Sequence, residues 1–311
     1  MSRHRISVII PTIGRPDDLR AMLGTLTRQT ILPDEFVLVN AGEMDLQELV
    51  RSCLAGSGID FKYATSRPGT SLQRNIALEM ADGDIYFLFD DDVKLEQDYI
   101  ERSLECFALE YDPPVGVVLG TFNGPPRKGG WRRTYRQFFG MTHSVPGKTA
   151  ALQASGAAQW LINPPDIVSV PVASGGRVAY RAACFDEERF DEFLPGYTIS
   201  EDVELSYRVS KKWTIVQSPH VRMDHDHSTV NRNAYGDIVA RSIYARFYFF
   251  RKHQPRDAYH IAAFAWFNVG FVAMYSAAGM RKSGPGATPI LQGIARGYQH
   301  CVKDLLGKRD W

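Results

Sequence analysis

The sequence predicts an α/β fold with a mainly parallel central sheet flanked by helices. Apolar, β-rich runs at residues 6–10, 36–39 and 85–89 alternate with stretches whose apolar residues recur at helical spacing, such as residues 19–26. Such alternation is typical of parallel strands joined by helices on both faces of a sheet. With 311 residues, 44% of them hydrophobic and 23% charged, the chain has a globular composition and room for one α/β domain with an appendage.

The remaining elements follow from start and stop signals along the chain. Pro11 ends the first strand, and Asp17 and Asp18 stand where the N-terminus of a helix favours negative charge. In order, we then expect a helix around 46–50, a weak strand at 61–64, a helix at 72–80 capped by Thr70 or Ser71, strands at 168–172 and 177–180, and a helix beginning near Glu201.

The stretch 122–160 follows neither pattern. Glycine, proline, arginine and serine are frequent there, and no periodicity persists. Long irregular segments inside enzymes often bind ligands or act as lids, so we expect this segment to close over the site. A solvated basic loop is the alternative. The basic residues around Trp131 are Arg127, Lys128, Arg132, Arg133 and Arg136.

Charge and cysteine content argue against several classes of protein. The formal net charge of +1 provides no global attraction to nucleic acid, which we do not expect as a partner. The four cysteines, Cys53, Cys106, Cys184 and Cys301, form no Cys-x-x-Cys pair, so neither a zinc knuckle nor a redox pair is expected. They are typical of reduced thiols in a cytosolic protein, and the first apolar run is too short for a signal peptide. We therefore expect a cytoplasmic location.

A ligand crevice is expected at one edge of the sheet. Pro11, Asn40 and Asp90 each stand at the end of an expected strand, although they are distant in sequence. Ligands of open α/β sheets bind beyond the carboxyl ends of the strands. These three residues should therefore lie along one crevice.

Asp90, Asp91 and Asp92 form an acidic triplet directly after the strand at 85–89. Adjacent carboxylates repel one another, and a bound divalent cation relieves that repulsion. Magnesium and manganese prefer oxygen ligands and bridge phosphate oxygens. The triplet therefore predicts a site for a metal and a diphosphate, with a solvated acidic turn as the alternative.

Glu201 and Asp202 form a second acidic site. A carboxylate at the mouth of the same crevice could take the proton from an attacking hydroxyl group. We choose Asp202 as this base, with Glu201 supporting it or orienting the acceptor. The alternative is a helix N-terminus that carries acidic residues, which is a common feature.

Two further groups could complete the site. A neutral imidazole of His225 could join the metal ligands opposite Asp92, whereas His227 is a weaker candidate. The guanidinium group of Arg74 could engage a diphosphate in fork geometry. A polar loop and a surface arginine are the respective alternatives.

These motifs occur in a definite order. From the N-terminus to the C-terminus they are Val8-Ile9-Ile10-Pro11-Thr12 with Arg15 and residues 26–30; Gly69 with Arg74-Asn75; Gly83-Asp84 before Phe89-Asp90-Asp91-Asp92; Gly175-Gly176 with Tyr180-Arg181; Glu201-Asp202-Val203-Glu204-Leu205 with Arg208; and His225 with Ser228. Over roughly residues 5–230, the set resembles the inverting family-2 glycosyltransferases with the GT-A fold. The ordered set is far more specific than any one of its members.

The resemblance implies a nucleotide-sugar-binding fold with three groups of binding residues and a general base. The donor would be bound by Pro11, Thr12, Arg15, Asn40, Arg74, Asp90 and Asp91. Asp92 would ligate Mn²⁺ or Mg²⁺, with Asp90 and His225 as further ligands. Gly175, Gly176 and Arg181 would bind the acceptor. Asp202 would be the general base of a single displacement that inverts the anomeric carbon.

The sequence departs from the family pattern at two positions. The family's second strand usually ends in an Asp-Asp-Gly-Ser type sequence, whereas this chain reads Asn40-Ala41-Gly42-Glu43. Asn40 can accept a hydrogen bond and can also donate one, so the nucleotide base of the donor stays open. Arg177 follows Gly175-Gly176 where a smaller polar residue is more usual, which suggests an anionic acceptor.

We therefore expect a metal-dependent inverting glycosyltransferase of the hexosyltransferase type. It would move a sugar from a nucleotide-diphosphate sugar to a hydroxyl of a glycan or lipid-linked acceptor, in polysaccharide or glycolipid assembly. A non-catalytic glycan-binding or assembly protein on the same fold is the first alternative. A sugar-nucleotide pyrophosphorylase ranks lower, because residues 11–18 lack the glycine-rich, lysine-bearing loop that it requires.

The expected domain boundary lies near residue 230. Residues 1–230 would form the catalytic domain, with a donor half at about 1–121 and an acceptor half at about 160–230, and residues 231–311 a helical region. Residues 258–280 contain no Asp, Glu, Lys or Arg and meet the length rule for a membrane span. The basic and aromatic residues before them favour an interfacial helix on anionic lipid, peripheral on the inner face of the membrane. A helical hairpin packed on the catalytic domain or on a second subunit of a homo-oligomer is the alternative.

Overall fold

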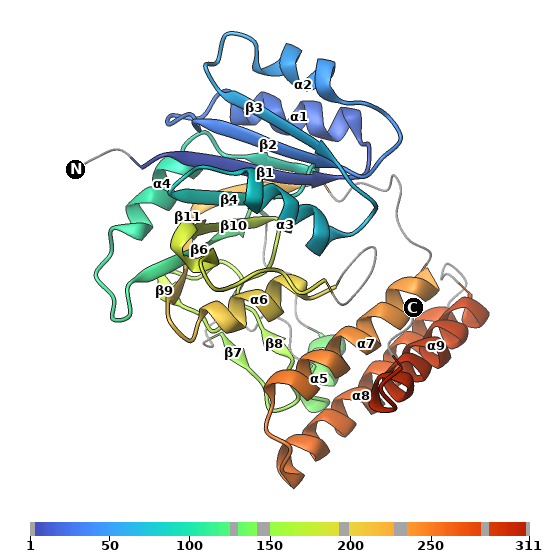
Figure 1. The fold of residues 1–311 in the computed structure, drawn as a ribbon. Helices are drawn as coiled ribbons and strands as arrows, with labels where there is room; N and C mark the ends of the chain where they lie inside the picture. Colours follow the sequence, from blue (N-terminus) through green and yellow to red (C-terminus); the bar gives the residue numbers. More distant parts are fainter. Residues whose placement is uncertain are drawn as a thin grey trace. The chain divides into compact units, whose positions relative to one another are not determined.

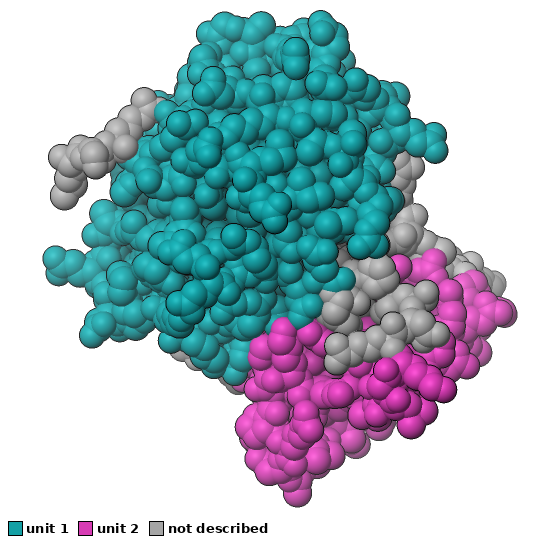
Figure 2. Space-filling model, in the orientation of Figure 1, with its two compact units in different colours: residues 1–125, 163–197, 201–231 teal, residues 126–162, 198–200, 232–311 magenta. Residues whose placement is uncertain are grey.

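The computed structural model describes residues 4–124, 130–141, 150–192, 199–226, 235–280 and 286–308, which form two compact units. Unit 1 comprises residues 1–125, 163–197 and 201–231, and unit 2 comprises residues 126–162, 198–200 and 232–311 (Figure 2). The stretch 126–162 therefore groups with the C-terminal helices.

Unit 1 is built on one mixed sheet (Figure 1). Its strands are β1 (Ile6–Thr12), β2 (Glu35–Asn40), β3 (Asp60–Thr65), β4 (Ile85–Phe89), β5 (Val93–Leu95), β6 (Val115–Phe122), β9 (Val168–Ser169), β10 (Arg177–Arg181) and β11 (Thr214–His225). The order is β3-β2-β1-β4-β10-β6-β11-β5, and β9 also pairs with β11. Strands β1 to β4 pair in parallel, as do β6 and β11, whereas β10 runs antiparallel between β4 and β6. The mainly parallel α/β fold is confirmed.

The helices of unit 1 pack on the apolar strands. They are α1 (Pro16–Leu26), α2 (Gln47–Leu54), α3 (Thr70–Met80), α4 (Tyr99–Phe107) and α6 (Glu201–Val209), with a 3-10 turn at Ala182–Phe185. Leucines of α1 and α2 and the aromatic residues of α4 form one core with alternate residues of β1, β2 and β4. Helix α3 packs against β1 and β2 outside that core.

The start of α3 differs from the expectation. The helix begins at Thr70, its N-cap is Gly69, and no side chain caps it. Thr70 and Ser71 are already helical, so their hydroxyl groups are one and two residues too late for the cap position. The prediction of a Thr70 or Ser71 cap was wrong.

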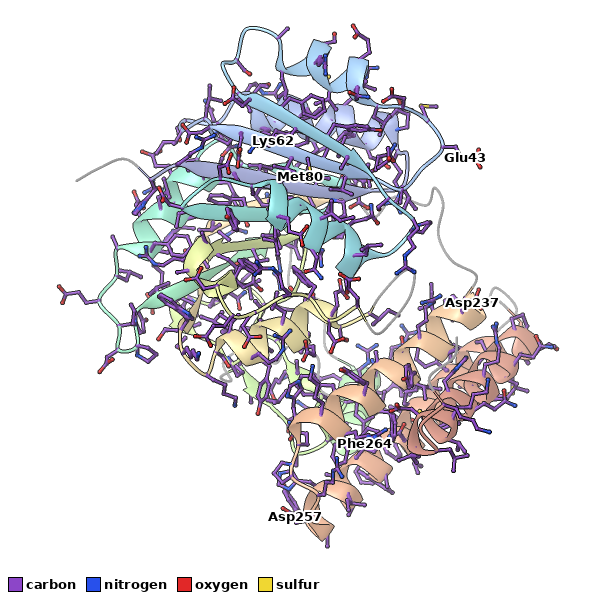
Figure 3. All side chains as sticks on the ribbon, viewed as in Figure 1. Glu43, Lys62, Met80, Asp237, Asp257 and Phe264 are labelled. Atoms are coloured by element: carbon purple, nitrogen blue, oxygen red, sulfur yellow. The ribbon has the colours of Figure 1, made fainter. Side chains whose placement is uncertain are left out.

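A buried ionic cluster ties the first strands together at the edge away from the acidic triplet. Glu35 is fully buried and accepts hydrogen bonds from Ser7 Oγ (2.5 Å) and the Asp82 backbone N–H (2.6 Å). Lys62 Nζ lies 2.7 Å from Glu35 and donates to the carbonyl oxygen of Met80 (2.6 Å), joining β3 to the end of α3 (Figure 3). Burial favours the neutral carboxyl group, but hydrogen bonds from Lys62 and Ser7 hold the pKa of Glu35 below its usual value.

Unit 2 contains mainly helices. Its elements are α5 (Trp131–Phe138), the short strands β7 (Ala151–Leu152) and β8 (Ala158–Gln159), α7 (Tyr235–His253), α8 (Ala258–Gly279) and α9 (Ala287–Leu305). Helices α7 and α9 approach closely because glycines line their contact: a Cβ added at Gly293 would lie 2.2 Å from the carbonyl oxygen of Gly236. The expected helical C-terminal region is confirmed.

Candidate functional site

The acidic triplet occupies the turn between β4 and β5. Asp91 and Asp92 are buried, whereas the side chain of Asp90 is 36% exposed. The three carboxylates therefore have different surroundings, although they are adjacent in sequence.

Three of the predicted metal ligands converge at this turn. Ligand atoms of Asp90, Asp92 and His225 all lie within 4.8 Å of one another, and His225 Nε2 is 2.9 Å from Asp92 Oδ1. His225 is the last residue of β11. It pairs with Val93 of β5, the residue that directly follows the acidic triplet, and therefore lies beside Asp92. Two carboxylates and an imidazole suit Mn²⁺ or Mg²⁺, so the donor set fits such an ion. His227 lies outside the described residues.

Asp91 faces the end of β1. Thr12 Oγ1 donates to Asp91 Oδ2 (2.5 Å), and Arg15 Nη1 donates to Asp91 Oδ1 (3.0 Å). Burial raises the pKa of Asp91 to about 6, although Thr12 and Arg15 oppose the rise. Thr12 and Arg15 were predicted to line the nucleotide pocket beside Pro11. Their hydrogen bonds fix the position of the Asp91 carboxylate.

Asn40 organises the loop that follows β2. Its amide donates to the carbonyl oxygen of Met44 (2.7 Å) and to Tyr63 Oη (3.1 Å), and its oxygen accepts from the Gly42 N–H (2.8 Å). Both amide protons are thus used within the protein. Contact between Asn40 and a nucleotide base stays a prediction.

The second acidic pair begins α6. Asp202 accepts hydrogen bonds from the backbone N–H of Gly175 and from that of Val203 (2.8 Å). Burial raises the pKa of both Glu201 and Asp202 above their usual values. The two backbone donors favour the ionised form of Asp202.

Arg74 joins the two acidic sites. Its Nη1 lies 2.8 Å from Glu201 Oε1 and its Nη2 3.3 Å from Asp90 Oδ1, and the guanidinium group stacks over the Phe190 ring at 5.2 Å. Burial disfavours the charged guanidinium, but the carboxylates of Glu201, Asp90 and Asp202 raise the pKa of Arg74 above its usual value. Arg74, predicted to contact the diphosphate, is therefore seated between the metal ligands and the candidate base.

Two neighbours of Arg74 on α3 were missed as site residues. Gln73 Nε2 donates to the carbonyl oxygens of Thr12 and Val39, each at 2.8 Å, and so ties the ends of β1 and β2. Asn75 exchanges hydrogen bonds with the backbone of Phe190, at 2.9 Å in each direction, on the segment that precedes α6. The run of three consecutive polar residues between Leu72 and Ile76 was the available signal.

Gly175 and Gly176 fit closely between the charged groups. A Cβ at Gly175 would lie 3.0 Å from Arg74 Nη2, and a Cβ at Gly176 would lie 2.3 Å from Asp90 Oδ2. Gly176 also has a φ of +75°, which residues other than glycine rarely adopt. The pair predicted to bind the acceptor thus forms the surface against which Asp90 and Arg74 are held.

Gly176→Ala is expected to weaken manganese binding about 10- to 100-fold, as loss of a residue that orients a ligand typically does. The added methyl group forces the Asp90 carboxylate away from Asp92 and His225. Gly56→Ala is the matched control, because Gly56 has a φ of +76° and nothing within 4 Å of an added Cβ. Calorimetric titration with manganese compares the two variants. Equal affinities would show that the Gly176 contact does not position Asp90.

The two arginines predicted on the acceptor side make their contacts within the domain, Arg177 at the edge of the sheet that carries the site and Arg181 at the opposite edge. Arg181 pairs with Ile85 at the opposite end of β4, and it donates to the carbonyl oxygens of Val115 and Phe107, each at 2.8 Å. Arg177 is buried, donates to Ser174 Oγ (2.9 Å) and stacks on Phe122. Because β10 runs antiparallel, the residue four positions after Arg177 lies at the far edge of the sheet. The position of Arg181 at the far edge corrects its assignment to the acceptor. Arg177 is buried beside the site, and an anionic acceptor stays a prediction.

The segment expected to act as a lid is described in part. Residues 125–129, with Arg127 and Lys128, and residues 142–149 lie outside the described residues. The helix α5 within this stretch belongs to unit 2. Closure over the site stays a prediction.

Comparison with known proteins identifies the family of the N-terminal half of the chain. Residues 7–161 match the model of glycosyl transferase family 2. A search of curated protein sequences finds no match.

Several solved structures share the fold. The mannosyltransferase PcManGT from Pyrobaculum calidifontis, in complex with GDP-Man and Mn²⁺, is 17% identical with a TM-score of 0.58, and the match covers 99% of this chain and 89% of that one. TarS residues 1–349 from S. aureus with UDP-GlcNAc gives 14% identity, a TM-score of 0.56, and coverage of 95% and 81%. GalNAc-T7 in complex with UDP, GalNAc and Mn²⁺ is 13% identical with a TM-score of 0.59, and the match covers 88% of this chain and 57% of that one. At these identities, the likeness establishes a shared GT-A fold.

Proposed function

Because residues 7–161 belong to glycosyl transferase family 2 and the chain is an enzyme of the glycosyltransferase class, we propose that it is a metal-dependent inverting transferase. It moves a sugar from a nucleotide-diphosphate sugar to a hydroxyl group of a glycan or lipid-linked acceptor. The observation that carries this proposal is the convergence of two acidic sites on one arginine. Arg74 contacts Asp90 of the ligand cluster and Glu201 beside the candidate base.

In the proposed reaction, Asp202 takes the proton of the acceptor hydroxyl group as that oxygen attacks the anomeric carbon. The bond from this carbon to the diphosphate breaks at the same time, and the nucleoside diphosphate leaves with the bonding electrons. Burial makes the Asp202 carboxylate a stronger base, and the Gly175 and Val203 N–H groups fix its orientation. A one-step attack from the opposite face inverts the anomeric centre.

The leaving diphosphate requires positive charge. A divalent cation held by Asp90, Asp92 and His225 would neutralise the charge that develops on the diphosphate oxygens. Arg74 holds Asp90 at one side of this cluster, and Arg15, 3.9 Å from Asp92, holds the other. The complexes of PcManGT and GalNAc-T7 with Mn²⁺ support the choice of ion.

The location and biological setting are also proposals. We place the enzyme in the cytoplasm, where nucleotide-activated donors are made, at the inner face of the membrane, with a role in polysaccharide or glycolipid assembly. The surface of unit 2 described below supports the membrane contact.

A screen of nucleotide sugars by thermal shift tests this function. In manganese, the correct donor is expected to raise the unfolding midpoint, because ligand at ~100 times its Kd adds ~2.7 kcal/mol to the stability of the folded state. The same donor in excess chelator is the control and should give a much smaller shift. The proposal fails if no nucleoside-diphosphate sugar, whichever its base, shifts the midpoint or is hydrolysed in manganese.

A further inference from the structure

Positive charge is concentrated in unit 2. Residues 126–162, 198–200 and 232–311 contain 18 lysines and arginines and four aspartates, a net +14 within a chain of net +1. Charges separated by more than ~10 Å are largely screened at 0.1 M salt, so each unit presents its own local field. The near-neutral total charge therefore conceals a strongly basic unit that would attract an anionic partner.

Helix α8 presents an apolar face to solvent. It has 22 residues, none of them acidic or basic apart from His260, and an 18-residue window reaches a mean hydropathy of 1.5 while only 17% of it is buried. Its exposed residues recur at helical spacing and are all apolar or aromatic: Ala258, Tyr259, Ile261, Ala262, Ala265, Trp266, Val269, Ala273 and Ala277. A continuous exposed stripe of this kind marks an interaction surface.

The short helix α5 is fixed onto α8. Tyr135 Oη donates to the carbonyl oxygen of Gly270 (2.8 Å), and Trp266 Nε1 donates to that of Phe138 (2.8 Å). Phe139 stacks on Trp266 with ring centroids 4.7 Å apart, and it fills the space at Gly270, where a Cβ would lie 2.3 Å from the ring. The placement of α5 is therefore specific.

This packing places large aromatic residues at the surface. The exposed fractions are 69% for Trp131, 65% for Phe138 and 44% for Trp266, and Arg132 is exposed on the same short helix. Tryptophan, with an apolar ring and a polar N–H group, is typical of the boundary between lipid headgroups and acyl chains, and basic residues bind anionic headgroups.

The inner face of α8 argues against a membrane-spanning orientation, because it contacts polar and charged groups of α7 and α9. The guanidinium group of Arg246 from α7 stacks on Phe271 at 4.4 Å, and Asn268 accepts a hydrogen bond from Tyr298 of α9 (3.0 Å). Helices α7 and α9 are joined by the Arg251–Asp304 ion pair (2.5 Å). A spanning α8 would bring these charged partners into the bilayer at high cost.

We propose that α5 and α8 together form a surface that binds an anionic lipid bilayer, with α8 parallel to the membrane plane. The aromatic residues Trp131, Phe138 and Trp266 enter the headgroup region, and the basic residues of unit 2 contact the lipid phosphates. A second copy of the chain is a poorer occupant of this surface, because two units of net +14 repel each other. This inference rests on the proposed membrane location and names the helices that make the contact. Helix α5 belongs to the segment that was expected from its sequence to act as a lid, and here it binds lipid instead.

Co-sedimentation of the full chain with vesicles tests the surface without donor or metal, so its result does not depend on the catalytic proposal. Binding is expected to vesicles of phosphatidylglycerol and phosphatidylcholine, and not to phosphatidylcholine alone. It should fall sharply between about 0.1 M and about 1 M salt, as the screening length falls from ~10 Å to ~3 Å. Trp131→Glu/Phe138→Glu should weaken partitioning about tenfold or more, because two large apolar side chains become anionic.

The matched control is Met44→Glu/Tyr111→Glu, which adds the same two charges at exposed apolar residues of unit 1. Unfolding midpoints of both double variants check that each is folded. The proposal is overturned if wild-type protein does not bind anionic vesicles at low salt, or if the two double variants bind equally well. A soluble dimer that dissociates only in the Trp131→Glu/Phe138→Glu variant, without vesicle binding by wild type, would assign the surface to a second copy instead.

Discussion

Asp202→Asn is expected to lower the single-turnover rate of sugar transfer by ~10² to 10⁴-fold, the usual contribution of a general base, while donor affinity changes little. The amide cannot take the acceptor proton. Both Asp202 oxygens accept backbone N–H groups, so the amide nitrogen also loses one of these two hydrogen bonds. The loss of a hydrogen bond costs about 1 kcal/mol of stability, and the unfolding midpoint must therefore be measured beside the rate.

Glu201→Gln is the matched comparison for this variant. Glu201 is also buried at the start of α6, and its Oε1 lies 2.8 Å from Arg74 Nη1, but its proposed role is only to support the base. Its substitution should cost less in rate than Asp202→Asn. The two carboxyl groups are adjacent and titrate together, so rates and donor affinities decide the assignment better than a pH profile does. A near wild-type rate for Asp202→Asn would transfer the role of base to Glu201, and loss of donor binding would move Asp202 to the donor site.

Asp92→Asn is expected to abolish measurable turnover and to weaken donor binding in manganese. Asp92 is buried and its Oδ1 lies 2.9 Å from His225 Nε2, so the substitution removes one of the two carboxylates of the ligand cluster. Metal ions supply several kcal/mol of stabilisation to a leaving group, and each ~1.4 kcal/mol is a factor of ten in rate. Initial rates and calorimetric donor affinities, with manganese and with excess chelator, measure both effects.

Asp226→Asn provides the control for a lost aspartate near His225. Asp226 is half exposed and pairs with Lys94 at 2.6 Å, outside the ligand cluster. Its substitution should leave the manganese dependence as in wild type. Full activity of the wild-type enzyme in excess chelator, or equal rates for the two variants, would exclude the metal role.

The parts of the site that the sequence predicted well are local. Strands β1 and β4 are apolar runs that end at Thr12 and Phe89, within one residue of the expected ends, and parallel pairing brings such ends to one edge of the sheet. Glu201 and Asp202 were expected at the start of a helix, where α6 begins. The sequence thus indicated which residues would stand at this edge of the sheet, because strand ends and helix starts are determined by neighbouring residues.

Contacts between distant segments could be read from sequence only in part. His225 was expected as a metal ligand opposite Asp92, 133 positions away, and the two side chains do meet. Glu201 and Arg74 are separated by 127 positions, and no local pattern reveals that they meet. The misplacement of Arg181 has the same origin. Gly175 and Gly176 lie at the site, but the antiparallel direction of β10 carries the chain away from it by Arg181, and strand direction depends on the neighbouring strands.

The sequence by itself determined the α/β class, the order of the elements, the two acidic motifs and the apolar character of residues 258–280, because each depends on residues close together in the chain. Only the tertiary structure decided that Arg74 lies between Asp90 and Glu201, that a histidine from β11 reaches the acidic turn, and that α5 packs on α8. The physical reason is that charge pairing and burial act through space. A buried guanidinium group requires carboxylates, but which groups meet is determined by the packing of segments far apart in sequence.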